Sequence, residues 1–275
     1  MTIRIGHIEY ANCTPIFSTL TRHFDCSCYE FVKGVPYQLN QLLRGGAIDV
    51  SPSSSIEYGA AWRNYYLLPE LSISSIGPVK SVFLFSRMPI EELAGESIGL
   101  TTDSDTSVNL LKIILARRYG FANTFERTAL PLTDALRTFA ALLLIGDAAL
   151  KACRNAGGAY HIYDLGELWN EYTGLPFVFA LWIVRAETVE RQRREVAMLV
   201  SDLLAAKELA YASYEEIAAG ATEREWLGKS ELIDYWRTIS YDLTPAHLEG
   251  VNLFYFFAVE LGLIAEKPEL RIFQI

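Results

Sequence analysis

The stretch that decides the fold is CYEFVKGVPYQLNQLLRGGAIDVSPSSSIEYGAAW, residues 28–62. Its first seven residues contain the aromatic and β-branched side chains that are typical of a strand. The segment 35–46 predicts a helix, because a proline opens it and a glycine pair closes it. AIDVSPSS then predicts another strand, and the serines of SSSIEYGAAW precede a further helix. This alternation of strand and helix is typical of a parallel sheet with helices packed on its faces.

The same alternation continues on both sides of this stretch. Upstream, RIGHIEY predicts a strand that is followed by a turn and by a helix from Pro15. Downstream, ESIGLTT and ALLLIGD predict strands, and DTSVNLLKIILARRYG and LTDALRTF predict helices. After the long apolar strand LPFVFALWIV, the pattern is almost wholly helical over 189–263. We therefore expect an α/β protein with two lobes, each with its own sheet and flanking helices.

Two apolar segments, 81–87 and 177–184, bracket the second β/α unit and are the expected crossings between the lobes. The expected division is residues 1–86 plus 186–275 for the first lobe and residues 87–185 for the second. A ligand would then bind in a cleft between the lobes, beyond the carboxyl ends of the strands.

Composition and charge exclude several classes of partner. The chain has 275 residues, of which 51% are hydrophobic and 21% charged, and its formal net charge is −9. We expect no nucleic-acid partner, because phosphate binding needs a basic surface. MTIRIGHIEYANCTP alternates like a strand and does not resemble a secretory signal. No uncharged apolar run of about 18 residues occurs, so we expect no membrane association and a cytoplasmic location.

The sequence also gives no support for a metal or an organic cofactor. The four histidines are scattered, and the C-x-C of Cys26 and Cys28 has no second pair to complete a metal site. Neither G-x-G-x-x-G nor G-x-x-x-x-G-K-[ST] occurs, which argues against nucleotide cofactors. No Ser-His-Asp set can be proposed from the spacing of these residue types either.

Hydroxyl groups gather instead at two junctions between a strand and a helix. TTDSDTSVNLL, residues 101–111, contains Ser104, Thr106 and Ser107 and no basic side chain. The first N–H groups of a helix have no partner within the helix and carry partial positive charge, so hydroxyls beside them can form an anion site. PSSSIEY has the same form, with Ser53, Ser54 and Ser55. Ordinary N-capping is the alternative interpretation at both junctions.

Further polar residues are expected at the same edge of the sheets. Asn12 ends the first strand in YANCTP, Ser81 opens the segment after Gly77-Pro78, and Gly146 and Asp147 lie at the turn in LLIGDAAL. For Asn12 an Asx-turn, and for Asp147 an N-cap, are the alternatives. All of these positions are candidates for binding a ligand with two anionic groups.

Taken together and in order, these motifs resemble the chorismate dehydratase family. YANCTP, PSSSIEY, SIGPVKSVFLFS, TTDSDTSVNLLKIIL, LLIGDAAL, DLGELWNEYTGLPFVFALW and GVNLFYFFAVELGLI carry the resemblance over nearly the whole chain. The resemblance implies a two-lobed fold similar to type 2 periplasmic binding proteins. The chain departs from the family pattern at Ala11, where leucine is usual. It also lacks the C-P-N-D-T-F turn of the related dihydroxynaphthoate synthase.

The resemblance also implies a reaction and roles for residues. Chorismate, a dicarboxylate, would lose water to give 3-[(1-carboxyvinyl)oxy]benzoate in the futalosine route to menaquinone, and its own enolpyruvyl carboxylate would take the proton. Asn12 and Ser81 match the positions expected to orient the reacting ring and carboxylate as hydrogen-bonding catalytic residues, and no metal or cofactor is implied. The alternatives are a solute-binding protein for a small carboxylate, a ligand-sensing domain and dihydroxynaphthoate synthase. The apolar segment 250–264 leaves a homodimer open as an option.

Overall fold

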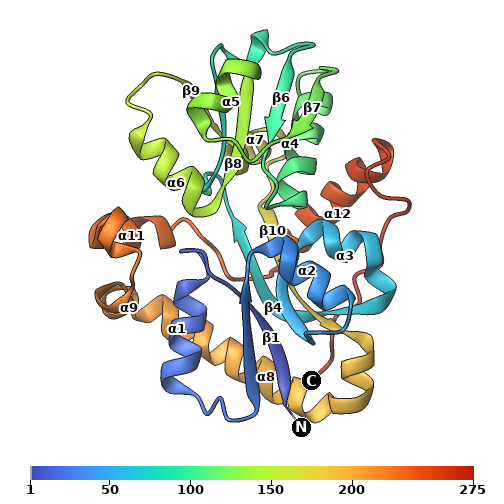
Figure 1. Ribbon diagram of the computed structural model, residues 1–275. Helices are drawn as coiled ribbons and strands as arrows, with labels where there is room; N and C mark the ends of the chain where they lie inside the picture. The colour runs from blue at the N-terminus through green and yellow to red at the C-terminus, as the bar shows by residue number, and fades with distance from the viewer. Residues whose placement is uncertain (1) are drawn as a thin grey trace.

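Two five-stranded sheets, one in each lobe, organise the computed structural model, which describes residues 2–275 (Figure 1). The first sheet has the order β2-β1-β3-β10-β4. Its strands are β1 (Ile3–Ile8), β2 (Tyr29–Gly34), β3 (Val50–Ser54), β4 (Tyr65–Ser75) and β10 (Phe177–Arg185). β1 is parallel to β2 and β3, and β10 is antiparallel to both of its neighbours. The stretch 28–62 therefore supplies two parallel strands, β2 and β3, which lie on either side of β1.

The second sheet has the order β7-β6-β8-β5-β9. Its strands are β5 (Val82–Ser86), β6 (Ser97–Leu100), β7 (Thr124–Arg127), β8 (Ala141–Ile145) and β9 (His161–Asp164). β6 runs parallel to β7 and β8, whereas β5 is antiparallel to β8 and β9. Both sheets are thus mixed, which confirms the expected fold class.

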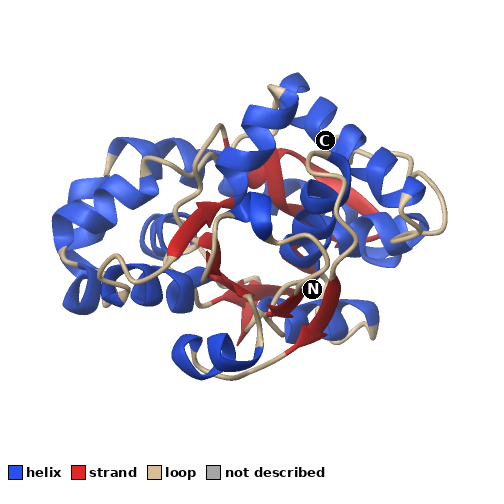
Figure 2. Ribbon diagram, turned by 90° about the horizontal axis from the view of Figure 1, so that it is seen from above, coloured by secondary structure: helices blue, strands red, loops and turns tan. Residues whose placement is uncertain are grey.

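Helices surround both sheets (Figure 2). The first lobe carries α1 (Thr14–His23), α2 (Pro36–Arg44), α3 (Ser55–Ala61), α8 (Ala186–Ala212), α9 (Tyr214–Gly220), α10 (Arg224–Leu227), α11 (Lys229–Trp236) and α12 (Pro245–Glu260). The second lobe carries α4 (Asp105–Arg117), α5 (Leu132–Thr138), α6 (Gly146–Asn155) and α7 (Leu165–Thr173). Prolines stand in the first turns of α1, α2 and α12, where a missing N–H costs no helical bond. Within residues 2–275, no helix is long and apolar enough to cross a membrane.

The chain crosses between the lobes twice, and the strand pairing differs from the expected division at both crossings. Residues 82–86, expected in the first lobe, form β5 of the second sheet. Residues 177–185, expected in the second lobe, form β10 between β3 and β4 of the first sheet. Both strands are apolar except for their last residues, Ser86 and Arg185, and fit the centre of either sheet, so only the pairing partner decides where each belongs.

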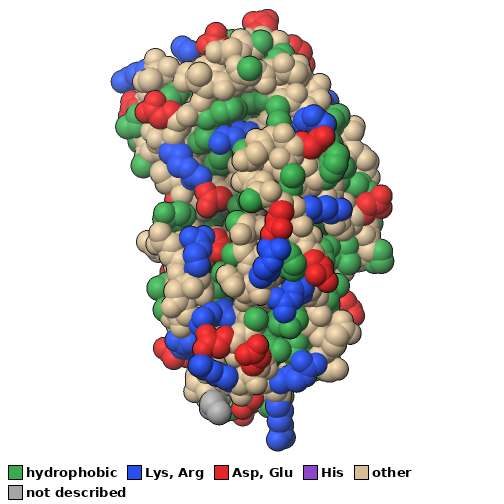
Figure 3. All heavy atoms as spheres, turned by 90° about the vertical axis from the view of Figure 1, so that its right-hand side faces the viewer, with side chains coloured by type: hydrophobic (Ala, Val, Ile, Leu, Met, Phe, Trp, Pro, Cys, Tyr) green, Lys and Arg blue, Asp and Glu red, His purple; other side chains and the backbone are tan. Residues whose placement is uncertain are grey.

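The outer surface carries charges of both signs. On the face shown in Figure 3, Lys and Arg side chains lie among Asp and Glu side chains on both lobes. Many of these charges form exposed ion pairs, such as Lys33 with Glu9 and Arg118 with Glu171. Such exposed pairs contribute about 0–1 kcal/mol each, so the apolar core carries most of the stability.

Candidate functional site

A cavity lies between the two lobes, at the edge where strands from both sheets end. It encloses about 570 Å³ of space between atoms, counting its open mouth. The polar side chains that line it are those of Tyr10, Asn12, Ser54, Ser81, Ser104 and Ser107. Apolar side chains, including those of Ile73 and Phe179, complete the wall. No acidic, basic or histidine side chain is among the lining residues of the described chain. The cavity can therefore offer hydrogen bonds but no charge of its own.

Asn12 lies on the turn between β1 and α1, and buried aromatic side chains hold the backbone of this turn. The indole Nε1 of Trp236 donates to the carbonyl oxygen of Ala11 at 2.7 Å. The hydroxyl of Tyr241 donates to the carbonyl oxygen of Asn12, also at 2.7 Å. The side-chain oxygen Oδ1 of Asn12 is buried and has no hydrogen-bond partner in the protein. Because buried polar atoms are nearly always paired, this oxygen is well suited to a ligand's donor.

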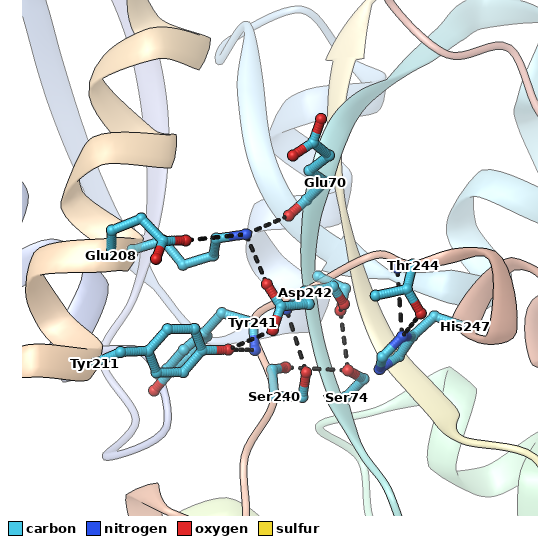
Figure 4. Close-up of polar contacts among 11 residues, drawn as sticks. Glu70, Ser74, Glu208, Tyr211, Ser240, Tyr241, Asp242, Thr244 and His247 are labelled. Atoms are coloured by element: carbon cyan, nitrogen blue, oxygen red, sulfur yellow. Dashed lines mark hydrogen bonds and ion pairs between the residues drawn. The ribbon is translucent and has the colours of Figure 1, made fainter.

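A buried polar network in turn holds Tyr241 in place (Figure 4). The backbone N–H of Tyr241 donates to the hydroxyl of Tyr211 at 2.7 Å, and that hydroxyl contacts the carboxylate of Asp242 at 3.1 Å. The same carboxylate accepts a hydrogen bond from the buried Lys207 ammonium at 2.7 Å. This pairing offsets the cost of burying the lysine charge. The network holds the segment between α11 and α12 in place. Through Tyr241 it thereby supports the Asn12 turn.

Ser81 lies at the end of the first crossing between the lobes, on a backbone that Asp164 holds. The Asp164 carboxylate accepts the N–H groups of Val79 at 3.1 Å and of Lys80 at 2.6 Å. Burial raises the pKa of Asp164, although its backbone hydrogen bonds oppose this shift. Lys80 has φ of +59°, a strained conformation for a residue with a side chain. The buried Ser81 hydroxyl donates to the carbonyl oxygen of Val79 at 3.5 Å.

The start of α4 presents two of the predicted hydroxyls to the cavity. Ser104 is the N-cap, and its Oγ accepts the N–H of Ser107 at 3.1 Å. The two serine hydroxyls lie 3.2 Å apart, and both line the cavity. Thr106 does not line it, because its Oγ1 accepts the N–H of Ile56, in α3 of the other lobe, at 3.0 Å. The end of α4 with partial positive charge therefore faces the cavity beside two hydroxyls.

The serines before α3 are used differently. Ser54 lines the cavity, and its Oγ accepts a hydrogen bond from the Asn40 amide at 3.0 Å. Ser55 donates instead to the carbonyl oxygen of Val178 in β10 at 2.6 Å. Ser53 is fully buried away from the cavity, and its hydroxyl has no partner. Only one of these three candidates is therefore in position to contact a ligand.

Gly146 and Asp147 begin α6, and only Gly146 lines the cavity. The Asp147 carboxylate points to the first lobe, where its Oδ1 accepts the N–H of Ala11 at 3.0 Å. Burial raises the pKa of Asp147, and the negative charge of Glu223 acts in the same direction. Of the predicted site residues, the cavity thus brings together Asn12, Ser54, Ser81, Ser104, Ser107 and Gly146. It leaves out Ser53, Ser55, Thr106 and Asp147. The roles of all these residues in ligand binding stay predictions.

Several lining residues were not among the sequence candidates, and the aromatic ones are Tyr10 and Phe179. Burial raises the pKa of the Tyr10 hydroxyl, and the charges of Asp103 and Asp147 raise it further, so this group remains a neutral donor. The sequence feature that could have identified Tyr10 is its position just after the first strand, two residues before Asn12. Phe179 lies within an apolar strand, and nothing in its sequence distinguishes it from a core residue.

The described residues contain no group of three or more His, Cys, Asp or Glu side chains arranged to hold a metal ion. His7 lies outside the cavity between the lobes and stacks on Phe17 with a ring separation of 3.9 Å. Burial lowers the pKa of His7, with a smaller contribution from Lys33. His7 is therefore part of the packing around β1, as expected for a structural histidine.

Comparisons with known proteins agree with this architecture. A crystal structure of an Archaeoglobus fulgidus protein superimposes with a TM-score of 0.74 at 19% identity, covering 96% of this chain and 98% of the other. The periplasmic aliphatic sulphonate binding protein of Escherichia coli gives a TM-score of 0.71 at 16% identity, covering 99% and 92%. The two lobes and the cleft thus define a protein of the periplasmic-binding-protein fold.

Sequence comparison narrows this class to one family. Residues 3–260 match the family described as menaquinone biosynthesis, and the chain belongs to that family. Chorismate dehydratase of Thermus thermophilus is 31% identical to this chain over 273 residues, which cover 94% of this chain and 95% of the relative.

Proposed function

We propose that this protein is a carbon–oxygen lyase that eliminates water from chorismate and releases 3-[(1-carboxyvinyl)oxy]benzoate. Family membership and the similarity to a chorismate dehydratase over almost the full length of both chains support this proposal. The observation that carries it is the chemistry of the cavity. Hydroxyl and amide groups from both lobes line it, and no charged side chain does.

Such a cavity suits a substrate with two carboxylates. The α4 start, with Ser104 and Ser107, would bind one carboxylate through hydroxyl and backbone donors. Asn12 and Ser81 would orient the ring and the second carboxylate, and the unpartnered Oδ1 of Asn12 would accept a substrate hydroxyl. Hydrogen bonds to ionised groups contribute about 1.5–3 kcal/mol each, so a few of them can hold a dianion.

The elimination itself needs a base and a leaving group. A proton leaves the ring carbon that bears the enolpyruvyl ether, and the C4 hydroxyl departs with a proton as water. The electron pair of the broken C–H bond completes the aromatic ring. Tyr10 is the one lining residue with a titratable side chain, and its raised pKa makes it a donor and not a base. We therefore assign the proton to the substrate's own enolpyruvyl carboxylate, which the protein holds in place.

Incubation with chorismate tests the proposal. Purified protein in EDTA should consume the cyclohexadiene absorbance, and NMR should identify the substituted benzoate as the product. Asn12→Ala and Ser81→Ala should each lower kcat/KM by roughly 10- to 100-fold, the loss expected for one hydrogen bond to a charged group. Ser201→Ala, on the exposed face of α8, is the matched control and should match the wild type.

The result with chorismate also separates the competing functions. The likeness to a sulphonate-binding protein favours small-anion binding without chemistry as the second candidate. Calorimetric binding of chorismate with no turnover would support that candidate and refute the lyase. Turnover with normal rates in both Asn12→Ala and Ser81→Ala would keep the lyase but remove the roles assigned to these residues.

A further inference from the structure

Asp147 joins the two lobes at the residue that directly precedes Asn12. It lies in the first turn of α6 in the second lobe, and its Oδ1 accepts the N–H of Ala11, in the first lobe, at 3.0 Å. The side chain of Ala11 is a fully buried methyl group, which cannot form a hydrogen bond. Asp147 therefore acts on the turn through the backbone N–H of Ala11. Asp147 itself is absent from the cavity wall.

The preceding residue, Gly146, contacts the other half of the site. Its N–H donates to the carbonyl oxygen of Ser81 at 2.8 Å. Its φ is +58°, and a Cβ atom at this position would lie 3.0 Å from the Tyr10 ring. Glycine is therefore required both by the backbone conformation and by the close approach of the first lobe. Two consecutive residues of α6 thus contact the backbone of both segments that carry Asn12 and Ser81.

The other partners of the Asn12 turn belong to the first lobe. Trp236 and Tyr241 hold the carbonyl oxygens of Ala11 and Asn12. Both contacts join residues of the first lobe to one another. The contact to Asp147 differs, since it forms only when the second lobe lies against the first.

We propose that Asp147 is a positioning residue, which holds the Ala11 amide and thereby aligns Asn12 at the cavity when the two lobes close. This inference rests on the proposed function, but only for the test that measures activity with chorismate. Closure of the lobes around the substrate would then complete the alignment of Asn12, and chemistry would proceed only in the closed arrangement. The hydrogen bond needs an acceptor oxygen at this position and does not need a negative charge.

Two substitutions separate the acceptor from the charge. Asp147→Asn retains an oxygen that can accept the Ala11 N–H, and Asp147→Ala removes it. We expect Asp147→Ala to lower kcat for chorismate about 10- to 100-fold with a smaller change in KM. Asp147→Asn should restore kcat to within about threefold of the wild type. Glu223→Gln removes a neighbouring charge without contacting Ala11 and should leave kcat unchanged.

Hydrogen exchange gives a readout that does not depend on activity. The closed arrangement in this structure already contains the bond between Asp147 and Ala11, and we expect the protein to adopt it without substrate. The Ala11 amide of the substrate-free protein should therefore exchange at least about 10-fold faster in Asp147→Ala than in the wild type or in Asp147→Asn. If the wild type does not turn over chorismate, the proposed function fails, and this exchange difference still tests the contact. Should Asp147→Ala not fold, Asp147→Ser, whose side chain is too short to span the gap, replaces it.

Two outcomes would overturn the proposal. One is an Asp147→Asn enzyme that is as slow as Asp147→Ala, which would mean that the charge and not the hydrogen bond matters. The other is an Ala11 amide that exchanges equally fast in all three proteins. Restored kcat in Asp147→Asn together with restored protection of Ala11 would support the proposal. The asparagine side chain can restore this one hydrogen bond, but it would not reverse a general loss of structure.

Discussion

The starts of α3 and α4 have similar sequences but different surroundings. Both follow a strand of their sheet and both are rich in serine and threonine. At α4, the hydroxyls of Ser104 and Ser107 face the cavity. At α3, the N–H of Ile56 is already bonded to Thr106 from the other lobe, and Ser55 is bonded to β10. A helix start is therefore a candidate ligand site only where the fold leaves its hydroxyls facing a cavity.

The largest expected effect is the loss of a cavity hydroxyl at α4. Ser107→Ala should lower kcat/KM for chorismate by about 10- to 100-fold, because a hydrogen bond to a charged group contributes roughly 1.5–3 kcal/mol. Steady-state kinetics measures this effect. Ser55→Ala, the same change at the start of α3, is the matched control and should keep kcat/KM within about twofold. If the two variants gave the opposite order, the assignment of the anion site to α4 would be wrong.

The next effect concerns the hydrogen bond that joins the two helix starts. Thr106→Val keeps the shape of the side chain but leaves the Ile56 N–H without its acceptor when the lobes are closed. An unsatisfied buried N–H costs about 1–3 kcal/mol, whereas water can satisfy this group when the lobes part. We therefore expect KM to rise about 10-fold with a smaller change in kcat.

Thr106→Ser provides the control for this prediction, because it keeps the hydroxyl oxygen and should restore KM. An unchanged KM in Thr106→Val would mean that the bond between Thr106 and Ile56 does not contribute to closure. Scattering measurements of the free and substrate-bound forms would then show whether the lobes move at all.

The fold could be predicted from the sequence further than the site could. The β/α alternation of residues 3–62 predicted the parallel strands β1, β2 and β3 of the first sheet, because strand and helix periodicities are local properties. The allocation of 82–86 and 177–185 to sheets could not be predicted, since each is an apolar strand that fits either sheet.

Among the site residues, too, some positions follow from the local sequence and others do not. Asn12 follows the first strand, Ser104 caps a helix and Ser81 directly precedes β5, and these positions are readable from local pattern. The partners of Thr106 and Asp147 are distant in sequence, at Ile56 and Ala11, so no local pattern could show these contacts.

A smaller effect, on stability and not on activity, is expected at Ser55. Its hydroxyl donates to the carbonyl oxygen of Val178 at 2.6 Å, and both residues are buried. Ser55→Ala should lower the free energy of unfolding by about 0.5–1.5 kcal/mol, the net contribution of a neutral hydrogen bond. Urea denaturation followed by circular dichroism measures it. A stability equal to that of the wild type would show that this bond does not fasten α3 to β10.

The smallest effect is expected at Ser53. Successive side chains of a strand point to opposite faces, so Ser54 faces the cavity and Ser53 faces away from it. The Ser53 hydroxyl is buried without a partner, so its removal relieves a desolvation cost instead of breaking a bond. Ser53→Ala should therefore leave kcat/KM unchanged and alter the free energy of unfolding by less than about 1 kcal/mol, in the stabilising direction. A clear loss of activity would instead mean that this hydroxyl reaches the ligand, and the start of α3 would then have to be treated as a second anion site alongside α4.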